Sequence, residues 1–352
     1  MRIASVEVVP YALPFREPYV TAAGSLERRE VVLLRLRSED GLEGLGEAVP
    51  LSLRGGAALE RVVSELEQLG DRDSLDEASL SGDALALSAP ARCAALTALL
   101  DLRGKRATMD EDSAAGPSLP VRCNATLIAD DPSAVVAAAE RWAADGFSTF
   151  KLKLGAGDDA AQVRAVREAL GPRARIRVDA NGAWDMETAK RTLGELEPYE
   201  IELAEQPVAT LEEAMEVARS TSIPLAGDES IESRADAERA AAMEACRMTG
   251  VKLSKVGGPE AAIEIAEVLP AYLSSALDGP VGIAVAAQVA ATLGEAAEGA
   301  APDLAHGLAT QRLFASTIAA VECELQGDML HSPAGPGLGV EIDEAALQAH
   351  RL

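Results

Sequence analysis

TFKLKLG at residues 149–155 is the first of several apolar runs in this chain that each end at a charged residue. It is followed by RIRVDANGAW at 175–184, IELAEQP at 201–207, PLAGDES at 224–230 and VKLSKVGG at 251–258. One strand, one helix and two loops fill about the length of each interval, so each interval indicates one βα unit. This part of the sequence therefore predicts a barrel of parallel strands.

The charged residues that end these runs are evenly spaced. The steps from Lys153 to Asp179, Glu205, Asp228 and Lys252 in turn are 26, 26, 23 and 24 residues. Because the carboxyl ends of parallel strands meet at one mouth of a closed barrel, we expect all five charges to share one site.

The rest of the chain supports a two-part organisation. Strands are predicted at about 121–127, 148–154, 175–179, 201–205, 223–227, 249–253, 271–275 and 303–307. Eight strands alternating with helices predict an α/β fold with a (β/α)8-type barrel. The first 50 residues instead show alternating β-branched runs with a hairpin turn at Glu39-Asp40-Gly41, and helical periodicity follows. We expect an α+β domain over residues 1–112, with 325–352 packing back on it, and the barrel over 113–324.

The amino-acid composition argues against some classes of binding partner. The chain has 352 residues, with 57 acidic and 32 basic side chains and a net charge of −25. That charge would repel a phosphate backbone and an anionic membrane surface, so we expect neither nucleic acid nor membrane as a partner. The four cysteines lie far apart without CxxC spacing and indicate core residues of a cytoplasmic protein. The oligomeric state stays open, a homo-oligomer included.

Three of the five charges predict a metal site. Carboxylates at the ends of three neighbouring strands would repel one another unless a cation lies between them. Side chains that offer only oxygen favour a hard ion, so Asp179, Glu205 and Asp228 are the predicted ligands of Mg²⁺, for which Mn²⁺ can substitute.

The lysines predict the chemistry. Lys151 and Lys153 are two residues apart on one strand, so both point to one face with about 6.5–7 Å between their Cα atoms. Two ammonium groups that close should lower at least one lysine pKa toward neutrality, which suits a general base. With Lys252 approaching from the other side of the barrel, the arrangement suits proton removal next to a carboxylate of a small-molecule substrate.

These motifs carry a family resemblance. KLKLG, VDANGAW, EQP, GDES and VKLSKVGG, in this order and spacing, resemble the enolase superfamily, specifically its muconate-lactonizing-enzyme subgroup. The resemblance covers essentially the whole chain and implies that the first domain is a capping domain. It also implies that Lys153 is the acid/base, that Lys151 lowers its pKa, and that Lys252 is a second acid/base or an electrostatic partner.

Members of this subgroup share the lysine and metal layout but catalyse different reactions. CNATL, LSSALDGPVGIA and AHGLATQRLF are similar to stretches of o-succinylbenzoate synthases. That similarity implies dehydration of 2-succinyl-6-hydroxy-2,4-cyclohexadiene-1-carboxylate, a step of menaquinone biosynthesis. An N-succinyl or N-acylamino acid racemase, a muconate-type cycloisomerase and a dipeptide epimerase are the alternatives. The Asp-x-Asp pattern of dipeptide epimerases is incomplete at Asp303-Leu304-Ala305. A barrel retained as a scaffold would not need five charges at its mouth.

Candidate substrate-binding residues lie beside these charges. Ser274 and Ser275 end a strand, and free N–H groups at the start of the following helix, near Gly279-Pro280, could hold a substrate carboxylate. Asn124 and Asn181 are further candidates. Lys255 is expected to be a supporting charge and His306 a structural residue.

Overall fold

The computed structural model describes residues 1–21, 24–52, 56–71, 75–84, 86–110, 119–128, 131–155, 157–296 and 303–352. The predicted domain boundary near residue 112 lies outside these ranges.

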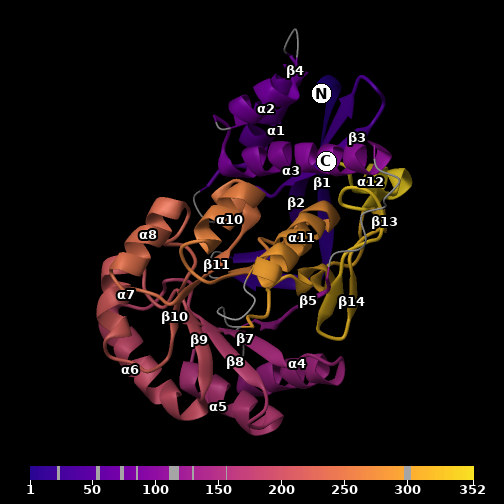
Figure 1. Cartoon of the computed structure of the whole chain (residues 1–352). Coiled ribbons are helices and arrows are strands. Elements are labelled where there is room, and N and C mark those ends of the chain that lie inside the picture. Colours follow the sequence, from indigo (N-terminus) through magenta and orange to yellow (C-terminus); the bar gives the residue numbers. More distant parts are fainter. Residues whose placement is uncertain are drawn as a thin grey trace.

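The N-terminal part is an antiparallel sheet covered by helices (Figure 1). Its strands have the order β3-β2-β1-β4, with the bounds β1 Arg2–Thr21, β2 Gly24–Ser38, β3 Glu43–Ala48 and β4 Leu75–Asp76. The helices are α1 Leu59–Gly70, α2 Glu77–Ala84 and α3 Ala89–Asp110. The predicted turn between β2 and β3 is confirmed, because Ser38 donates to the Leu42 carbonyl and Gly41 has φ +87°.

Glycine in β3 allows helix α3 to lie directly on the sheet. A Cβ on Gly46 would come within 1.9 Å of the Ala94 carbonyl oxygen of α3, and one on Gly44 within 2.2 Å of that of Ala98. Leu34 and Leu36 of β2 are fully buried in the same apolar cluster. The small residues of α3 and β3 therefore set how closely helix and sheet pack.

The larger part of the chain is a curled parallel sheet with helices outside it. Among the described residues, seven strands follow the order β12-β11-β10-β9-β8-β7-β6. Their bounds are β6 Ala125–Leu127, β7 Thr149–Lys153, β8 Arg175–Asp179, β9 Ile201–Glu205, β10 Leu225–Gly227, β11 Met248–Val251 and β12 Ala271–Leu273. The helices are α4 Pro132–Ala144, α5 Asp159–Leu170, α6 Met186–Leu196, α7 Leu211–Ala218, α8 Arg234–Ala242, α9 Leu253–Val256, α10 Pro259–Ala266 and α11 Pro280–Ala296.

The eighth predicted strand is reduced to a short connection between the two sheet edges. Cys123 pairs with His306, and Ser274 pairs with Gly307. Backbone hydrogen bonds join His306 and Gly307 to the residues on either side of these partners, including Gly307 N–H to the Leu273 carbonyl at 2.8 Å. The predicted α/β fold with a (β/α)8-type barrel is confirmed, with this closing segment shorter than expected.

The C-terminal residues return toward the first domain. Strand β15 (Met329–His331) pairs with β14 (Glu324–Gln326) and with β5 (Val121–Arg122), and β13 (Ala319–Val321) pairs with β16 (Glu341–Ile342). Helix α12 (Glu344–His350) lies against β1, and the Leu352 N–H donates to the Pro10 carbonyl.

The N-terminal domain covers the end of the barrel that carries the predicted site. Helix α3 packs on α9, the short helix that directly follows Lys252. Figure 1 shows this domain beside α10 and α11, with α4 to α8 around the outside of the sheet. All four cysteines are buried core residues. Among the described residues, no helix is long and apolar enough to cross a membrane.

Candidate active site

Strand register brings the predicted charges together at the carboxyl ends of the strands. Lys153 pairs with Asp179, and Asp179 pairs with Glu205, so these three residues lie side by side on β7, β8 and β9. Asp228 follows β10 directly, and Lys252 follows β11. The expectation that the five charges share one mouth of the barrel is confirmed.

The three carboxylates are buried, and each contacts lysine. Asp179 and Asp228 are 0% exposed and Glu205 is 1% exposed. Lys151 Nζ donates to both oxygens of Glu205 at 2.6 Å and lies 2.8 Å from Asp179 Oδ2. Burying so many charges is tolerable because each charge has an opposite partner.

Lys153 differs from Lys151 in its access to solvent. Its Nζ donates to Asp179 Oδ2 at 2.6 Å and to Asn181 Oδ1 at 2.9 Å. The side chain is 22% exposed, whereas that of Lys151 is 6% exposed. Of the pair on β7, Lys153 is therefore the residue that a substrate can reach.

Two lysines hold Asp228 from the other side. Lys252 Nζ donates to its carboxylate, and Lys255 Nζ contacts its carbonyl oxygen and lies 3.4 Å from Oδ1. Lys255 is buried and also donates to the Ile231 carbonyl at 3.2 Å. Lys255 is therefore a member of the buried charge cluster, whereas only a supporting charge was expected from the sequence.

The carboxylates around Lys151 act against a lowered pKa of this lysine. Burial lowers the pKa of Lys151, but the charges of Asp179 and Glu205 outweigh it and raise that pKa above its ordinary value. The expectation that at least one lysine of this pair has a lowered pKa is thus not met at Lys151. Burial raises the pKa of Asp179, yet Lys151 and Lys153 hold it well below its usual range. For Glu205, burial and the nearby Asp179 raise the pKa.

The donor chemistry fits a divalent cation. Three carboxylates from adjacent strand ends offer oxygen ligands alone, which is the preference of Mg²⁺. In the described part of the chain, no three acidic, histidine or cysteine side chains are arranged as a metal site, and these carboxylates contact lysines instead. Asp179, Glu205 and Asp228 remain the predicted ligands.

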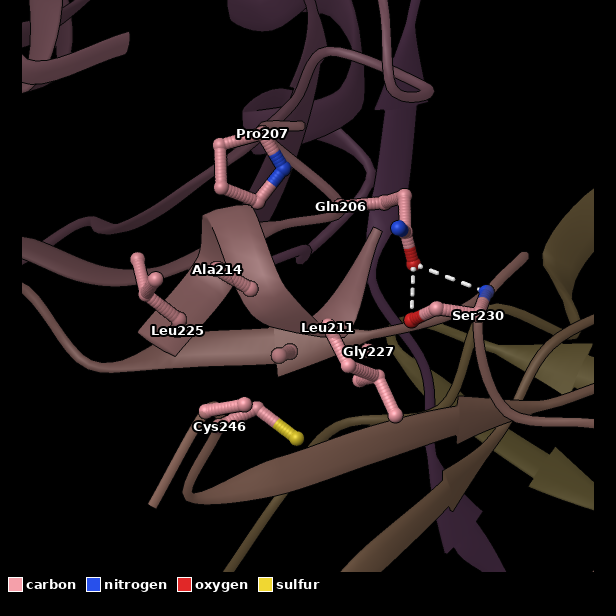
Figure 2. A pocket seen from close by; sticks show the side chains of 10 residues that line it. Gln206, Pro207, Leu211, Ala214, Leu225, Gly227, Ser230 and Cys246 are labelled. Atoms are coloured by element: carbon pink, nitrogen blue, oxygen red, sulfur yellow. Dashed lines mark hydrogen bonds between the residues drawn. The ribbon is translucent and has the colours of Figure 1, made fainter. Parts of the chain in front are cut away.

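Gln206 organises the loop that carries Asp228. Its Oε1 accepts hydrogen bonds from the backbone N–H of Asp228 at 2.8 Å and from the N–H and hydroxyl of Ser230 at 3.2 and 3.0 Å. Figure 2 shows the two bonds to Ser230, next to the apolar residues Leu211, Leu225 and Cys246. Gln206 itself has φ +38°, a strained value for a residue with a side chain. The EQP motif contains this glutamine, but the sequence alone did not predict that it binds the loop of Asp228.

The start of α11 is already occupied by a carboxyl group from the N-terminal domain. Glu47 of β3 is 2% exposed and accepts hydrogen bonds from Gly279 N–H at 2.6 Å, Val281 N–H at 3.2 Å and the Tyr11 hydroxyl at 2.9 Å. A Cβ on Gly279 would lie 2.7 Å from Glu47 Oε2, so glycine makes room for the carboxyl group. The expectation that these N–H groups are free for a substrate carboxylate is wrong.

The candidate substrate residues have mixed positions. Ser275 exchanges hydrogen bonds with Asp278 at 2.7 and 2.9 Å, as a capping serine does, and Ser274 sits at the barrel closure. Asn181 lies at the mouth, in contact with Lys153. Asn124 is buried beside the start of β7, because its neighbour Ala125 pairs with Phe150, so the structure does not bring it to the charge cluster.

His306 belongs to the barrel closure. Its Nδ1 accepts a hydrogen bond from the Leu273 N–H at 3.0 Å. Burial and the charge of Arg177 lower the pKa of His306 to about 4, so the ring is neutral at pH 7. This agrees with a structural role.

Comparison with known proteins identifies the family. The mandelate racemase / muconate lactonizing enzyme N-terminal domain matches residues 3–110, and the enolase C-terminal domain-like family matches residues 134–346. The chain therefore belongs to the enolase superfamily, in its muconate-lactonizing-enzyme subgroup.

Relatives in this family carry several activities. The o-succinylbenzoate synthase of Thermobifida fusca (strain YX) is 38% identical over 254 residues, which are 65% of this chain and 73% of that protein. A muconate lactonizing enzyme from Pseudomonas fluorescens, complexed with muconolactone, superposes with a TM-score of 0.87 at 28% identity over 99% of both chains. A dipeptide epimerase from Enterococcus faecalis V583, complexed with Mg and L-Leu-L-Tyr, superposes with a TM-score of 0.85 at 25% identity, over 97% of this chain and 100% of that one. The family is thus established, and it includes both lyases and isomerases.

Proposed function

We propose that this chain is an o-succinylbenzoate synthase, which dehydrates 2-succinyl-6-hydroxy-2,4-cyclohexadiene-1-carboxylate with Mg²⁺ as cofactor. The observation that carries the proposal is the mouth cluster of Lys153, Asp179, Glu205, Asp228 and Lys252. The identity with the Thermobifida fusca enzyme favours the dehydratase among the reactions that such a site supports.

The charge of the cluster supports an anionic substrate. Lys151, Lys153, Lys252 and Lys255 face three carboxylates, so a divalent cation would leave the buried site clearly positive. A buried excess of positive charge is costly until an anion neutralises it. A substrate with carboxylate groups would supply that neutralisation.

The geometry supports separate tasks for the lysines. Bound Mg²⁺ would stabilise the negative charge that develops on the substrate carboxylate when the neighbouring proton leaves. Lys153, as the more accessible lysine of β7, removes that proton from carbon. The same ammonium then returns the proton to the departing hydroxyl, so water leaves and the double bond forms. Lys252 stabilises charge from the opposite side.

Racemisation is the second candidate. In a racemase, Lys153 and Lys252 would act as acid and base on the two faces of the substrate carbon, and both lysines contact the same carboxylate cluster. Dipeptide epimerisation has less support. The carboxylate of Asp303 pairs with Arg122 and lies 3.9 Å from Arg175, which begins β8, so it faces the opposite end of the barrel from Asp179.

The test compares substrates on one purified sample with Mg²⁺. Rapid dehydration of the cyclohexadienyl acid, without deuterium exchange into N-succinyl amino acids in D₂O, is the expected result. Exchange into both amino acid enantiomers without dehydration would favour the racemase. If Lys153→Ala kept full turnover on every substrate, the assignment of the site would be wrong.

A further inference from the structure

Tyr272 reaches across the barrel interior to one of the predicted metal ligands. Its hydroxyl donates a hydrogen bond to Glu205 Oε2, and both residues are 1% exposed. Tyr272 is on β12 and Glu205 on β9, and two strands separate them in the sheet. The contact is therefore made through the inside of the barrel.

Two other residues fix the place of the phenol ring. Gly250 pairs with Tyr272 in the β11–β12 register, and a Cβ there would lie 3.1 Å from the Tyr272 Cε2 and hydroxyl oxygen. The guanidinium carbon of Arg177 lies 5.2 Å from the ring centroid. Arg177 is itself anchored, because its Nη1 donates to the Ala305 carbonyl at 2.6 Å. The ring thus occupies space that the absence of a side chain at Gly250 provides.

The two oxygens of Glu205 have different partners as a result. Oε2 accepts from both Tyr272 and Lys151, whereas Oε1 accepts from Lys151 at 2.6 Å. A carboxylate with one oxygen held by two donors cannot rotate freely about its terminal bond.

We propose that Tyr272 is a positioning residue that fixes the orientation of the Glu205 carboxylate, a predicted ligand of the divalent cation. The inference rests on the proposed metal-dependent function and deepens it. Partners that orient a metal-binding side chain commonly change metal affinity when they are removed.

The experiment measures metal binding directly. Mn²⁺ binding by electron paramagnetic resonance and Mg²⁺ binding by calorimetry are compared for wild type and Tyr272→Phe, and we expect about 10- to 100-fold weaker binding in the variant. Gly250→Ala is the second variant, because it displaces the ring while keeping the hydroxyl, and it should weaken binding in the same direction.

Tyr11→Phe is the matched control. It also removes a buried tyrosine hydroxyl that donates to a buried glutamate, Glu47, but at the domain contact. We expect it to lower thermal stability and to leave the metal dissociation constant unchanged. Thermal unfolding without metal verifies that each variant is folded, and Gly250→Ala decides the question if Tyr272→Phe does not fold.

The outcomes separate the two claims. Wild-type protein that binds neither ion would overturn the proposed metal function and the inference with it. Wild type that binds while Tyr272→Phe and Gly250→Ala bind equally well would overturn the positioning role alone. Equal weakening in Tyr11→Phe would show a general loss of stability and would also overturn it.

Discussion

Glu47→Gln is expected to change how the stability of the chain depends on pH. Burial, followed by the nearby Asp278, raises the pKa of Glu47 from its ordinary 4.5 to about 8, although hydrogen bonds from Tyr11, Gly279 and Val281 act in the opposite direction. The folded state therefore holds this proton more tightly than the unfolded state. Stability contributed by the protonated carboxyl is complete below pH 4.5 and is lost as the pH rises to about 8.

The size of the stability loss follows from the difference between the two pKa values of Glu47, 4.5 in the unfolded chain and about 8 in the folded one. At about 1.4 kcal/mol for each pH unit, the loss approaches roughly 5 kcal/mol in wild type and is absent for glutamine. The difference between the two proteins removes the titration of Glu47 itself, while titrating groups near it, which include Tyr11, Asp278 and Cys93, are present in both.

Urea unfolding at intervals from pH 5 to pH 9 measures this difference. Near pH 5 the two proteins should agree within about 1 kcal/mol, because a protonated carboxyl and an amide form similar hydrogen bonds. Between pH 5 and pH 9, wild type should lose the free energy of unfolding that its protonated Glu47 contributes, and the variant should not. At pH 9 the variant should therefore be more stable than wild type. A difference that stays constant, or that moves in favour of wild type as the pH rises, would refute the reasoning.

Three further predictions concern the site and the packing. Lys153→Ala should lower kcat about 10²- to 10⁴-fold in steady-state assays while the protein stays folded, as expected for loss of a general acid/base. Asp228→Asn should weaken Mg²⁺ binding measured by calorimetry, because one of three predicted anionic ligands becomes neutral; unchanged affinity would remove Asp228 from the ligand set. Gly46→Ala should destabilise the chain by more than about 1 kcal/mol in thermal unfolding, because its Cβ would lie 1.9 Å from a carbonyl oxygen of α3. Gly194→Ala is its control: Gly194 is an exposed residue within α6 with nothing within 4 Å of an added Cβ, and the change should stabilise by up to about 1 kcal/mol.

The sequence predicted what depends on periodicity. Even spacing and apolar runs identified β7 to β10 and placed Lys153, Asp179, Glu205 and Asp228 at one mouth, because the carboxyl ends of parallel strands meet at one end of a barrel. The closing segment at His306 and Gly307 was the hardest strand to predict. It forms only two bridge pairs with its neighbours, and so short a segment has little periodic pattern in the sequence.

Contacts between segments that are far apart in the chain could not be predicted from the sequence. Glu47 accepts a hydrogen bond from Gly279, which is 232 residues later in the chain. From the sequence alone, a glutamate in a strand is expected to be an ordinary surface residue. Tyr272 could have been noticed, because it lies two residues before Ser274 and so shares a face with it. Its partner Glu205 could not, since the bond crosses the barrel between strands that are not neighbours.

The two lysines of β7 show how position inside one cluster separates roles. Both lie on the same face, two residues apart, and both contact Asp179. Lys151 is enclosed between Asp179 and Glu205, whose charges raise its pKa and so favour its protonated form. Lys153 has an open side toward the mouth of the barrel and Asn181 as its second partner. The arrangement therefore supports Lys153 as the residue that exchanges a proton with substrate, for a reason different from the mutual repulsion of two ammonium groups.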